Sequence, residues 1–290
     1  MKPQLPTHRD LALARRSLLR FESRSQRLDT WHDGGRICWR RWGQGPNLVL
    51  IHGGHGSWMH WIRNIEPLAA RFCLWLPDMP GFGDSDALPG HPHRVDRQDQ
   101  LIAALAAGLQ QLLTDETWID LAGFSFGGLA AAQLANAWPR TRRLALIGTA
   151  GHGGDRRPHP QLLDWRGCKD SHLWEAHHFN LQSLMLHDVE HIDAQALVLH
   201  HCSSHATRYR SREFSRSAAV RQALALYRGD LLLLWGEHDV TAVPQDIGPL
   251  LCDGFANRHV RIVPDAGHWL QYEQSEQTNQ ILLDWFQSDI

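Results

Sequence analysis

The sequence predicts an α/β fold, in which helices cover both faces of a doubly wound, mostly parallel sheet, with a helical cap insertion. Short apolar runs alternate with helix-forming stretches in the order strand, helix, strand, helix, strand. This alternation is typical of parallel sheets, because each strand returns through a helix that covers one face. The pattern breaks from residue 151 to 228, where no strand is evident. We therefore expect a core of residues 1–150 and 229–290 and a mostly helical cap of residues 151–228.

Each element is predicted from its apolar pattern. Core strands are expected at 47–51, 72–76, 118–121, 143–149, 231–235 and 260–263. Two further strands are expected at 27–31 and 36–42, joined by the hairpin signal Asp33-Gly34-Gly35. Core helices are expected at 57–70, 97–113, 129–138 and 281–286, and cap helices after Asp193 and Ser217. Residues 1–24 form an arginine-rich N-terminal extension, with a short helix expected around 11–21.

The composition disfavours several classes of protein. A net charge of −2 with scattered basic residues does not suggest nucleic-acid binding, and no apolar stretch reaches the length of a membrane span. Five widely spaced cysteines without a CxxC motif indicate neither a disulfide framework nor a zinc ribbon. Arg15 and Arg16 interrupt the apolar residues near the N-terminus, so no export signal is evident. We therefore expect a cytoplasmic protein.

The central motif is Gly123-Phe124-Ser125-Phe126-Gly127-Gly128, between a predicted strand and a predicted helix. A serine at the tip of such a sharp turn needs small neighbours, because the strand and the helix would otherwise collide. The N-terminus of the helix also offers unpaired N–H groups where negative charge develops during acyl transfer. We therefore predict that Ser125 is a nucleophile. Ser85, the alternative, follows no such turn.

A serine nucleophile requires a base, and the base requires a carboxylate that orients it. His268 and Asp239 follow the last two predicted strands, and reactive groups gather at the carboxyl ends of parallel strands. We assign His268 as general base and acid, and Asp239 as its orienting carboxylate. The alternatives for the carboxylate are Glu237, Asp265 and Asp155, the last because it follows the strand after the serine motif.

The glycine-rich stretch His52-Gly53-Gly54-His55-Gly56 follows another central strand. Glycines there let a backbone N–H face a bound carbonyl oxygen. The predicted oxyanion hole therefore combines the N–H groups of Gly54 and Phe126. His52 is expected to hydrogen-bond the loop, and His55 either lines the pocket or faces solvent.

The cap is expected to choose the substrate. A basic cluster either pairs with a substrate carboxylate or lies on a solvated helix face, and it consists of Arg208, Arg210 and Arg212. The aromatic residues expected to desolvate an apolar substrate group are Trp165, Trp174 and Phe179.

Two pairs of cap histidines are spaced four residues apart, His187 with His191 and His201 with His205. Such pairs can bind zinc on a helix, but no carboxylate or cysteine arrangement completes either site. The sequence therefore predicts no metal, and these histidines are interpreted as solvated or pocket-lining.

The chain resembles the α/β-hydrolase superfamily over about residues 27–290 and, within it, the meta-cleavage-product hydrolases, which cleave C–C bonds in ring-opened aromatics. The matching stretches are HGG at 52–54, Arg63-Asn64, PGFGDSD at 80–86, GFSFGG at 123–128, GEHD at 236–239 and GHWLQYE at 267–273. The resemblance implies an α/β-hydrolase fold and a cap arginine that binds the substrate carboxylate. That family often has asparagine where this chain has His60 and Phe124. The substrate-binding residues that we expect are His55, His60, Phe124, Arg208 and Trp269.

These assignments predict a hydrolase with a Ser125–Asp239–His268 triad, acting on a small ester or on a C–C bond next to a ketone. Water is the second substrate, and no cofactor is required. Epoxide hydrolases and haloalkane dehalogenases use aspartate at the turn, so Ser125 argues against them. The alternative is a ligand receptor that uses the same scaffold without turnover. The expected partner is a small-molecule substrate, with neither nucleic acid nor membrane, and a homo-oligomer is left open.

Overall fold

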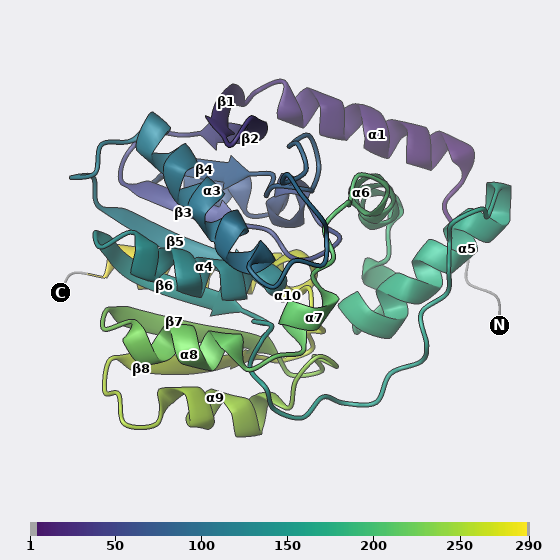
Figure 1. Cartoon of the computed structure of the whole chain (residues 1–290). Helices are drawn as coiled ribbons and strands as arrows, with labels where there is room; N and C mark the ends of the chain where they lie inside the picture. The colour runs from purple at the N-terminus through teal and green to yellow at the C-terminus, as the bar shows by residue number, and fades with distance from the viewer. Residues whose placement is uncertain (1–4, 289–290) are drawn as a thin grey trace.

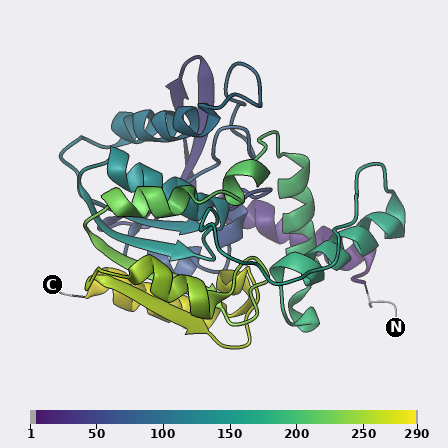
Figure 2. The same ribbon diagram turned by 60° about the horizontal axis from the view of Figure 1, so that its bottom comes forward.

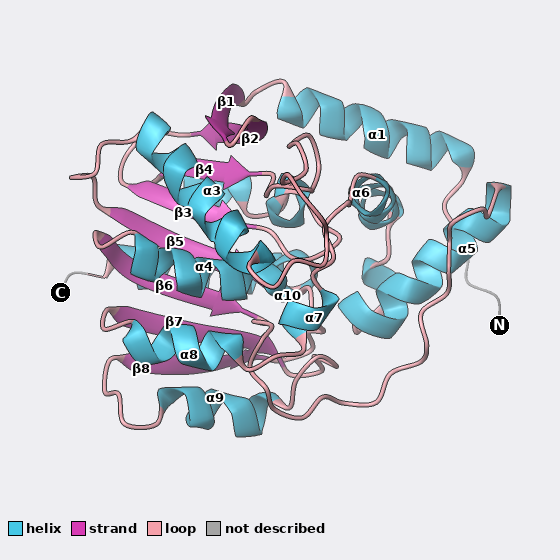
Figure 3. Cartoon of the chain, in the orientation of Figure 1, coloured by secondary structure: helices cyan, strands magenta, loops and turns pink. Residues whose placement is uncertain are grey.

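A computed structural model describes residues 5–288 and shows one eight-stranded sheet (Figures 1 and 3). The strands are β1 (Gln26–His32), β2 (Gly35–Trp42), β3 (Asn47–Ile51), β4 (Cys73–Pro77), β5 (Ile119–Phe124), β6 (Thr141–Ile147), β7 (Asp230–Gly236) and β8 (Arg258–Val263). Their order is β1-β2-β4-β3-β5-β6-β7-β8. The pairs β1–β2 and β2–β4 are antiparallel, and all other neighbours are parallel. The predicted mostly parallel, doubly wound sheet is confirmed.

Helices flank this sheet and extend beyond one of its ends (Figure 1). Among the described residues they are α1 (His8–Glu22), α2 (Ile65–Ala69), α3 (Arg97–Leu112), α4 (Phe126–Ala137), α5 (Asp170–Asn180), α6 (Ala194–His205), α7 (Arg212–Ser215), α8 (Ala219–Leu226), α9 (Pro244–Cys252), α10 (Leu270–Glu273) and α11 (Ser275–Gln287). Shorter 3₁₀ segments cover Trp58–Trp61 and Val189–His191, and a π-helical turn covers Leu181–Met185. Within residues 5–288, every helix falls short of the length and apolar character that a membrane crossing requires.

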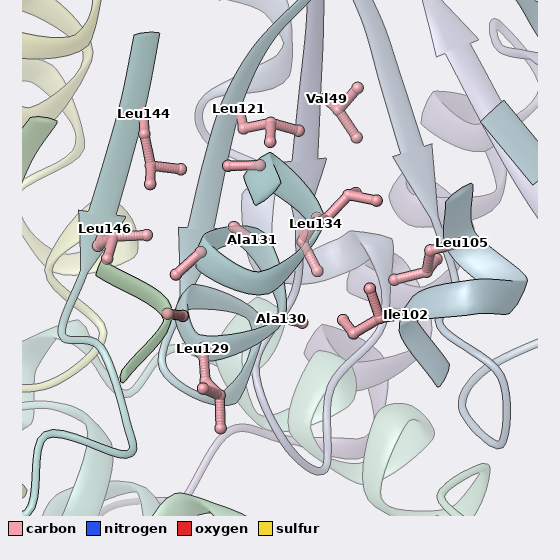
Figure 4. Close-up of a cluster of buried hydrophobic side chains, with 14 of the residues drawn as sticks. Val49, Ile102, Leu105, Leu121, Leu129, Ala130, Ala131, Leu134, Leu144 and Leu146 are labelled. Carbon is pink, nitrogen blue, oxygen red and sulfur yellow. The ribbon is translucent and has the colours of Figure 1, made fainter. Parts of the chain in front are cut away.

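Alternate residues of the central strands contribute to two hydrophobic cores, one on each face of the sheet. Val49 and Leu121 belong to the core under α3, α4 and α8, and Figure 4 shows the side chains of α4 packed among them. Leu48 and Leu50 belong to the other core. That second core continues into the cap through Leu197 of α6, so the cap is packed on the sheet rather than attached only by its two connections.

Helix α1, near the N-terminus, packs against α6 of the cap. It begins earlier than the predicted helix at 11–21, since Thr7 and Asp10 form a capping box at its start. Leu11 and Leu18 are buried on its inner face. Within the predicted N-terminal extension, residues 8–22 therefore form a helix.

Helices α5 and α6 lie beyond the end of the sheet toward which the parallel strands run (Figures 1 and 2). Helix α8 instead packs against α4, on one face of the sheet. Its buried face consists of Val220, Ala223 and Leu224, which join the core under α4. The boundary predicted at residue 228 therefore lies too late in the chain, because α8 packs with the core.

Candidate active site

Ser125 occupies the tight turn that joins β5 to α4. Its backbone angles, φ 54° and ψ −119°, lie outside the ordinary helix and strand regions. The N–H of Ser125 donates to the carbonyl oxygen of Ile147, and its own carbonyl oxygen accepts from Gly128 and Ala150. Hydrogen bonds to α4 and to the chain at the end of β6 therefore hold this strained turn.

Glycines around the turn allow the strand and the helix to approach closely. A methyl group built at Gly123 would lie 2.7 Å from the side chain of Ala131. One built at Gly127 would lie 2.5 Å from the carbonyl oxygen of Ile51. Side chains at these positions would therefore push α4 away from the sheet.

The serine, histidine and aspartate predicted from the sequence lie in one hydrogen-bonded row. His268 Nε2 lies 2.9 Å from the hydroxyl oxygen of Ser125, and His268 Nδ1 lies 2.9 Å from Asp239 Oδ2. Asp239 and His268 are buried, whereas Ser125 is partly exposed. Because an ionised carboxylate only accepts, Nδ1 donates to Asp239, and Nε2 is left as an acceptor for the serine proton.

Asp239 is held ionised by its hydrogen bonds. Burial by itself raises the pKa of this carboxyl, but the interactions with His268 and Thr241 outweigh burial and lower the pKa below its usual value. Thr241 donates to Asp239 Oδ1 through its backbone N–H, at 2.7 Å, and through its hydroxyl, at 2.8 Å. Thr241 is not among the residues predicted from the sequence, although its place two residues after the aspartate is typical of such a turn.

The alternative groups lie elsewhere. Asp155 is exposed and has no hydrogen-bond partner among the described residues. Glu237 and Asp265 contact each other, with 3.4 Å between a carboxylate oxygen of Glu237 and the backbone nitrogen of Asp265. Ser85 is buried, and its hydroxyl hydrogen-bonds two backbone groups of neighbouring segments. None of these four residues therefore contacts His268 in place of Asp239 or Ser125.

The two residues predicted to form the oxyanion hole belong to the wall of one cavity. Gly54 and Phe126 both line the cavity that contains Ser125 and His268. Within residues 5–288, neither N–H has a hydrogen-bond partner. Both groups are thus free to donate to an oxygen bound beside Ser125.

His60 and Trp269 lie behind the cavity rather than in its wall, which contradicts their predicted role in substrate binding. His60 Nδ1 accepts the N–H of Gly53 at 3.1 Å, and the indole of Trp269 donates to the carbonyl oxygen of His60 at 2.9 Å. Burial lowers the pKa of His60 well below its usual value, so its ring stays neutral. Its ring centroid lies 5.2 Å from that of Phe124, so His60 supports the cavity wall. His52 likewise joins two loops, because its Nδ1 lies 2.8 Å from the carbonyl oxygen of Gly53 and its Nε2 accepts the N–H of Met79, after β4, at 3.0 Å.

The cavity above Ser125 has a volume of about 1040 Å³. His55 and Phe124 line it, as predicted, together with apolar residues such as Leu184 and Met185. Its arginines are Arg156, Arg166, Arg208, Arg210, Arg212 and Arg216. Glu213 is the one acidic residue among the described residues that line the cavity. The cavity therefore carries a large excess of positive charge.

The predicted carboxylate partner Arg208 is already occupied. Its guanidinium donates to the carbonyl oxygens of Ala206 and Ser85, which join the cap to the loop after β4. Arg210 contacts His93, with 2.9 Å between the two nitrogens. Arg208 therefore holds the cavity wall together, and its predicted role in substrate binding is not supported.

Two other arginines of the cavity wall, Arg156 and Arg216, were not among the substrate-binding residues predicted from the sequence. Partial burial and the positive charge of Arg216 lower the pKa of Arg156. Arg156 donates to the carbonyl oxygen of Ser215. The guanidinium of Arg216 has no hydrogen-bond or ion-pair partner among the described residues. The arginines at 208, 210 and 212 form the denser cluster in the sequence, so no local signal pointed to this pair.

The cap aromatics expected over the active site do not line the cavity. The ring of Trp165 packs 4.3 Å from that of His205, and the ring of Trp174 packs 5.1 Å from that of His201. Apolar contact with a substrate would instead come from Phe124 and the residues around Leu184.

The fold and the serine turn together define a class of α/β enzymes that carry a nucleophile between a central strand and the following helix. The model of the alpha/beta hydrolase family matches residues 48–281, and this chain belongs to that family. The 2-hydroxy-6-oxononadienedioate/2-hydroxy-6-oxononatrienedioate hydrolase of Escherichia coli (strain K12 / DH10B) is 30% identical over 270 residues, which cover 86% of this chain and 90% of the relative. The predicted resemblance to meta-cleavage hydrolases is confirmed, and the chain is an enzyme of the hydrolase class.

Solved structures agree on the fold. The carboxylesterase CesB (YbfK) from Bacillus subtilis has a TM-score of 0.72 at 20% identity, over 97% of this chain and 98% of that one. The meta-cleavage product hydrolase CumD from Pseudomonas fluorescens IP01 has a TM-score of 0.70 at 20% identity, over 89% and 97%. At this level of identity, both likenesses show the fold alone.

Proposed function

We propose that this hydrolase uses Ser125 as nucleophile, His268 as general base and acid, and Asp239 as the carboxylate that orients His268. The observation that carries the proposal is the unbroken row of two 2.9 Å hydrogen bonds from Ser125 through His268 to Asp239. Ser125 and His268 line a cavity of about 1040 Å³, which is large enough for a small-molecule substrate.

In the first proposed step, the Ser125 oxygen attacks a substrate carbonyl carbon while its proton moves to His268 Nε2. The negative charge that develops on the carbonyl oxygen is stabilised by the N–H groups of Gly54 and Phe126. The bond to the leaving atom then breaks, and this atom takes the electron pair and the proton from His268. Water attacks the resulting acyl-serine in the same way and releases a carboxylic acid.

The substrate is proposed to be a dianion, a ring-opened product with two carboxylates, and the bond cleaved is a C–C bond next to a ketone. The excess of arginine in the cavity supports an anionic substrate, because each unpaired guanidinium matches a carboxylate in shape and charge. The E. coli relative is named for dioate substrates of this kind. We assign Arg156 and Arg216, rather than Arg208, as the carboxylate-binding pair.

The first experiment compares three substrates with the wild-type enzyme and with Ser125→Ala. These are a 2-hydroxy-6-oxo-dienedioate, a neutral chromogenic acetate ester and a half-ester of a dicarboxylic acid. We expect the dienedioate to have the highest kcat/KM and the Ser125→Ala variant to be inactive. A fluorophosphonate should label Ser125 in the wild type. Labelling of another serine would refute the nucleophile, and preference for the neutral ester would replace the C–C hydrolase with an esterase.

The second experiment tests the arginine pair. Arg216 is exposed, so the cost of truncating it depends on how far the substrate buries the charge pair; a pair that the substrate desolvates costs about 2–5 kcal/mol, or at least about 30-fold in kcat/KM. We expect Arg216→Ala to lose this much with the dienedioate and little with the neutral ester. Arg221→Ala is the matched control, because Arg221 lies exposed on α8 and does not line the cavity. Equal losses for both substrates would exclude carboxylate binding by Arg216.

A further inference from the structure

Three histidines of two cap helices gather at one point, away from the proposed active site. His201 and His205 lie four residues apart on α6, and so face the same side of the helix, while His177 comes from α5. One ring nitrogen of each residue lies within 4.8 Å of one from both others. None of the three lines the cavity above Ser125. These residues are called the cap histidine cluster below.

We propose that the cap histidine cluster binds a single divalent transition-metal ion, with Zn²⁺ as the expected metal. Three imidazole ligands suit zinc, copper, nickel and iron rather than calcium or magnesium, which prefer oxygen. Two histidines one helical turn apart and a third from another element are a familiar zinc-binding arrangement. Water would complete a tetrahedral site, since no fourth protein ligand stands with these three among the described residues.

The distances within the cap histidine cluster are close to those of a metal site. His177 Nε2 and His201 Nδ1 lie 3.0 Å apart. Two nitrogens bound to one tetrahedral zinc at 2.0–2.1 Å would lie about 3.3 Å apart. The ring of His205 lies 4.3 Å from that of His201, and its exposed side chain is able to turn toward the ion. Small rotations of the rings are therefore sufficient to form the site.

The surroundings favour well-oriented ligands. His177 is fully buried. Trp165 packs against the ring of His177 and Trp174 against that of His201, which restricts the orientations of both rings.

The cluster is also reachable from outside. His205 is exposed, and a cavity of about 370 Å³ between α1 and the cap is lined by His201 and Trp174. An ion bound here would join α5 to α6 and so stabilise the cap. The alternative is a hydrogen-bonded histidine pair that only packs against tryptophans, and this alternative predicts no specific metal affinity.

The decisive experiment titrates the chelator-treated full chain with Zn²⁺ by calorimetry and repeats thermal unfolding with and without the metal. We expect one tight site with a Kd in the micromolar range or below, and a rise in Tm on zinc binding. Co²⁺ used as a spectroscopic probe should give the visible absorption of tetrahedral nitrogen coordination. These measurements do not depend on the proposed hydrolase mechanism.

Two exposed histidines provide a matched pair of variants. His205→Ala should weaken zinc binding at least tenfold and abolish the rise in Tm, whereas His172→Ala, on the exposed side of α5, should change neither. His201→Asn, checked for folding by circular dichroism, should behave like His205→Ala. Equal effects of His205→Ala and His172→Ala, or no tight site in the wild type, would overturn the proposal.

Discussion

Replacing Asp239 by asparagine is the sharpest test of the proposed mechanism, because the structure shows which hydrogen bonds of the carboxylate an amide would keep and which it would lose. Oδ1 of Asp239 accepts both hydrogen bonds from Thr241, and Oδ2 accepts the bond from His268. In Asp239→Asn the carbonyl oxygen keeps the Thr241 bonds, and the NH₂ group takes the place of Oδ2. His268 Nδ1 must then accept a hydrogen bond, so the proton moves to Nε2. With Nε2 protonated, His268 is unable to take the proton of Ser125.

The expected loss is a factor of about 10⁴ in kcat, which is the effect of this change in the serine proteases. At 1.36 kcal/mol per tenfold change, this corresponds to about 5.4 kcal/mol of transition-state stabilisation. The assay is steady-state turnover of the dienedioate and of a chromogenic ester, with circular dichroism to verify that the variant is folded. Fluorophosphonate labelling of Ser125 should slow by a similar factor, because labelling requires the same proton transfer.

Two controls separate orientation of His268 from general damage. Thr241→Val removes one hydrogen bond to the carboxylate but leaves its charge. It should cost about 10- to 150-fold, since a hydrogen bond to a charged group contributes about 1.5–3 kcal/mol. Asp155→Asn should leave kcat unchanged, because Asp155 is exposed and makes no hydrogen bond to Ser125, His268 or Asp239. A folded Asp239→Asn enzyme with more than a tenth of wild-type activity, or an inactive Asp155→Asn enzyme, would refute the assignment.

Three further predictions concern stability and are measured by denaturant or thermal unfolding. Gly127→Ala should destabilise the fold by about 1–3 kcal/mol, because its methyl group would overlap rigid carbonyl oxygens of the loop after β3, and an unchanged Tm would contradict this. Arg40→Met should cost about 3–5 kcal/mol, since it leaves the carboxylate of Asp78 buried and unpaired, whereas Arg24→Ala, which removes an exposed ion pair, should cost less than about 1 kcal/mol. His60 has a lowered pKa in the folded state, so the unfolded chain binds more protons below about pH 6.5 and stability is lost as the pH falls. His60→Asn keeps an acceptor for the N–H of Gly53, but its side chain does not titrate. The slope of the unfolding free energy between pH 6 and 5 should therefore be shallower than in the wild type by up to about 1.4 kcal/mol per pH unit. An unchanged slope would count against this reasoning.

The sheet was predictable from the sequence because its strands are short, continuous apolar runs, and the order of strands and helices leaves few topologies. The proximity of His268 and Asp239 followed from the rule that strand ends meet at one edge of a parallel sheet. Their hydrogen bonds to each other and to Ser125 are geometric findings, and their catalytic roles stay predictions until the variants are measured.

The predictions that were wrong share one physical cause. A local sequence pattern indicates that a side chain is buried or charged, but it does not show which residue that side chain contacts. The apolar face of α8 predicts packing, yet only the tertiary structure shows that the partner is α4. Arg208 was expected to bind a carboxylate, but backbone carbonyl oxygens take up its donors. His177 lies 24 residues before His201, so no helical spacing connects it with the pair on α6.

The charge of the cavity bears on the chemistry as well as on affinity. Cleavage of an ester needs no special leaving group, because an alcohol oxygen accepts the electron pair readily. Cleavage of a C–C bond requires the departing carbon to be conjugated with an electron-withdrawing group that spreads the negative charge. The keto tautomer of a carboxylate-bearing dienol is such a group, because the departing carbon is then conjugated with a ketone that takes up its electron pair. The proposed pair Arg156 and Arg216 would hold this end of the substrate while its charge increases. Arg216→Ala should therefore lower kcat as well as raise KM for the dienedioate, and an effect on KM alone would mean that the arginine only binds the substrate.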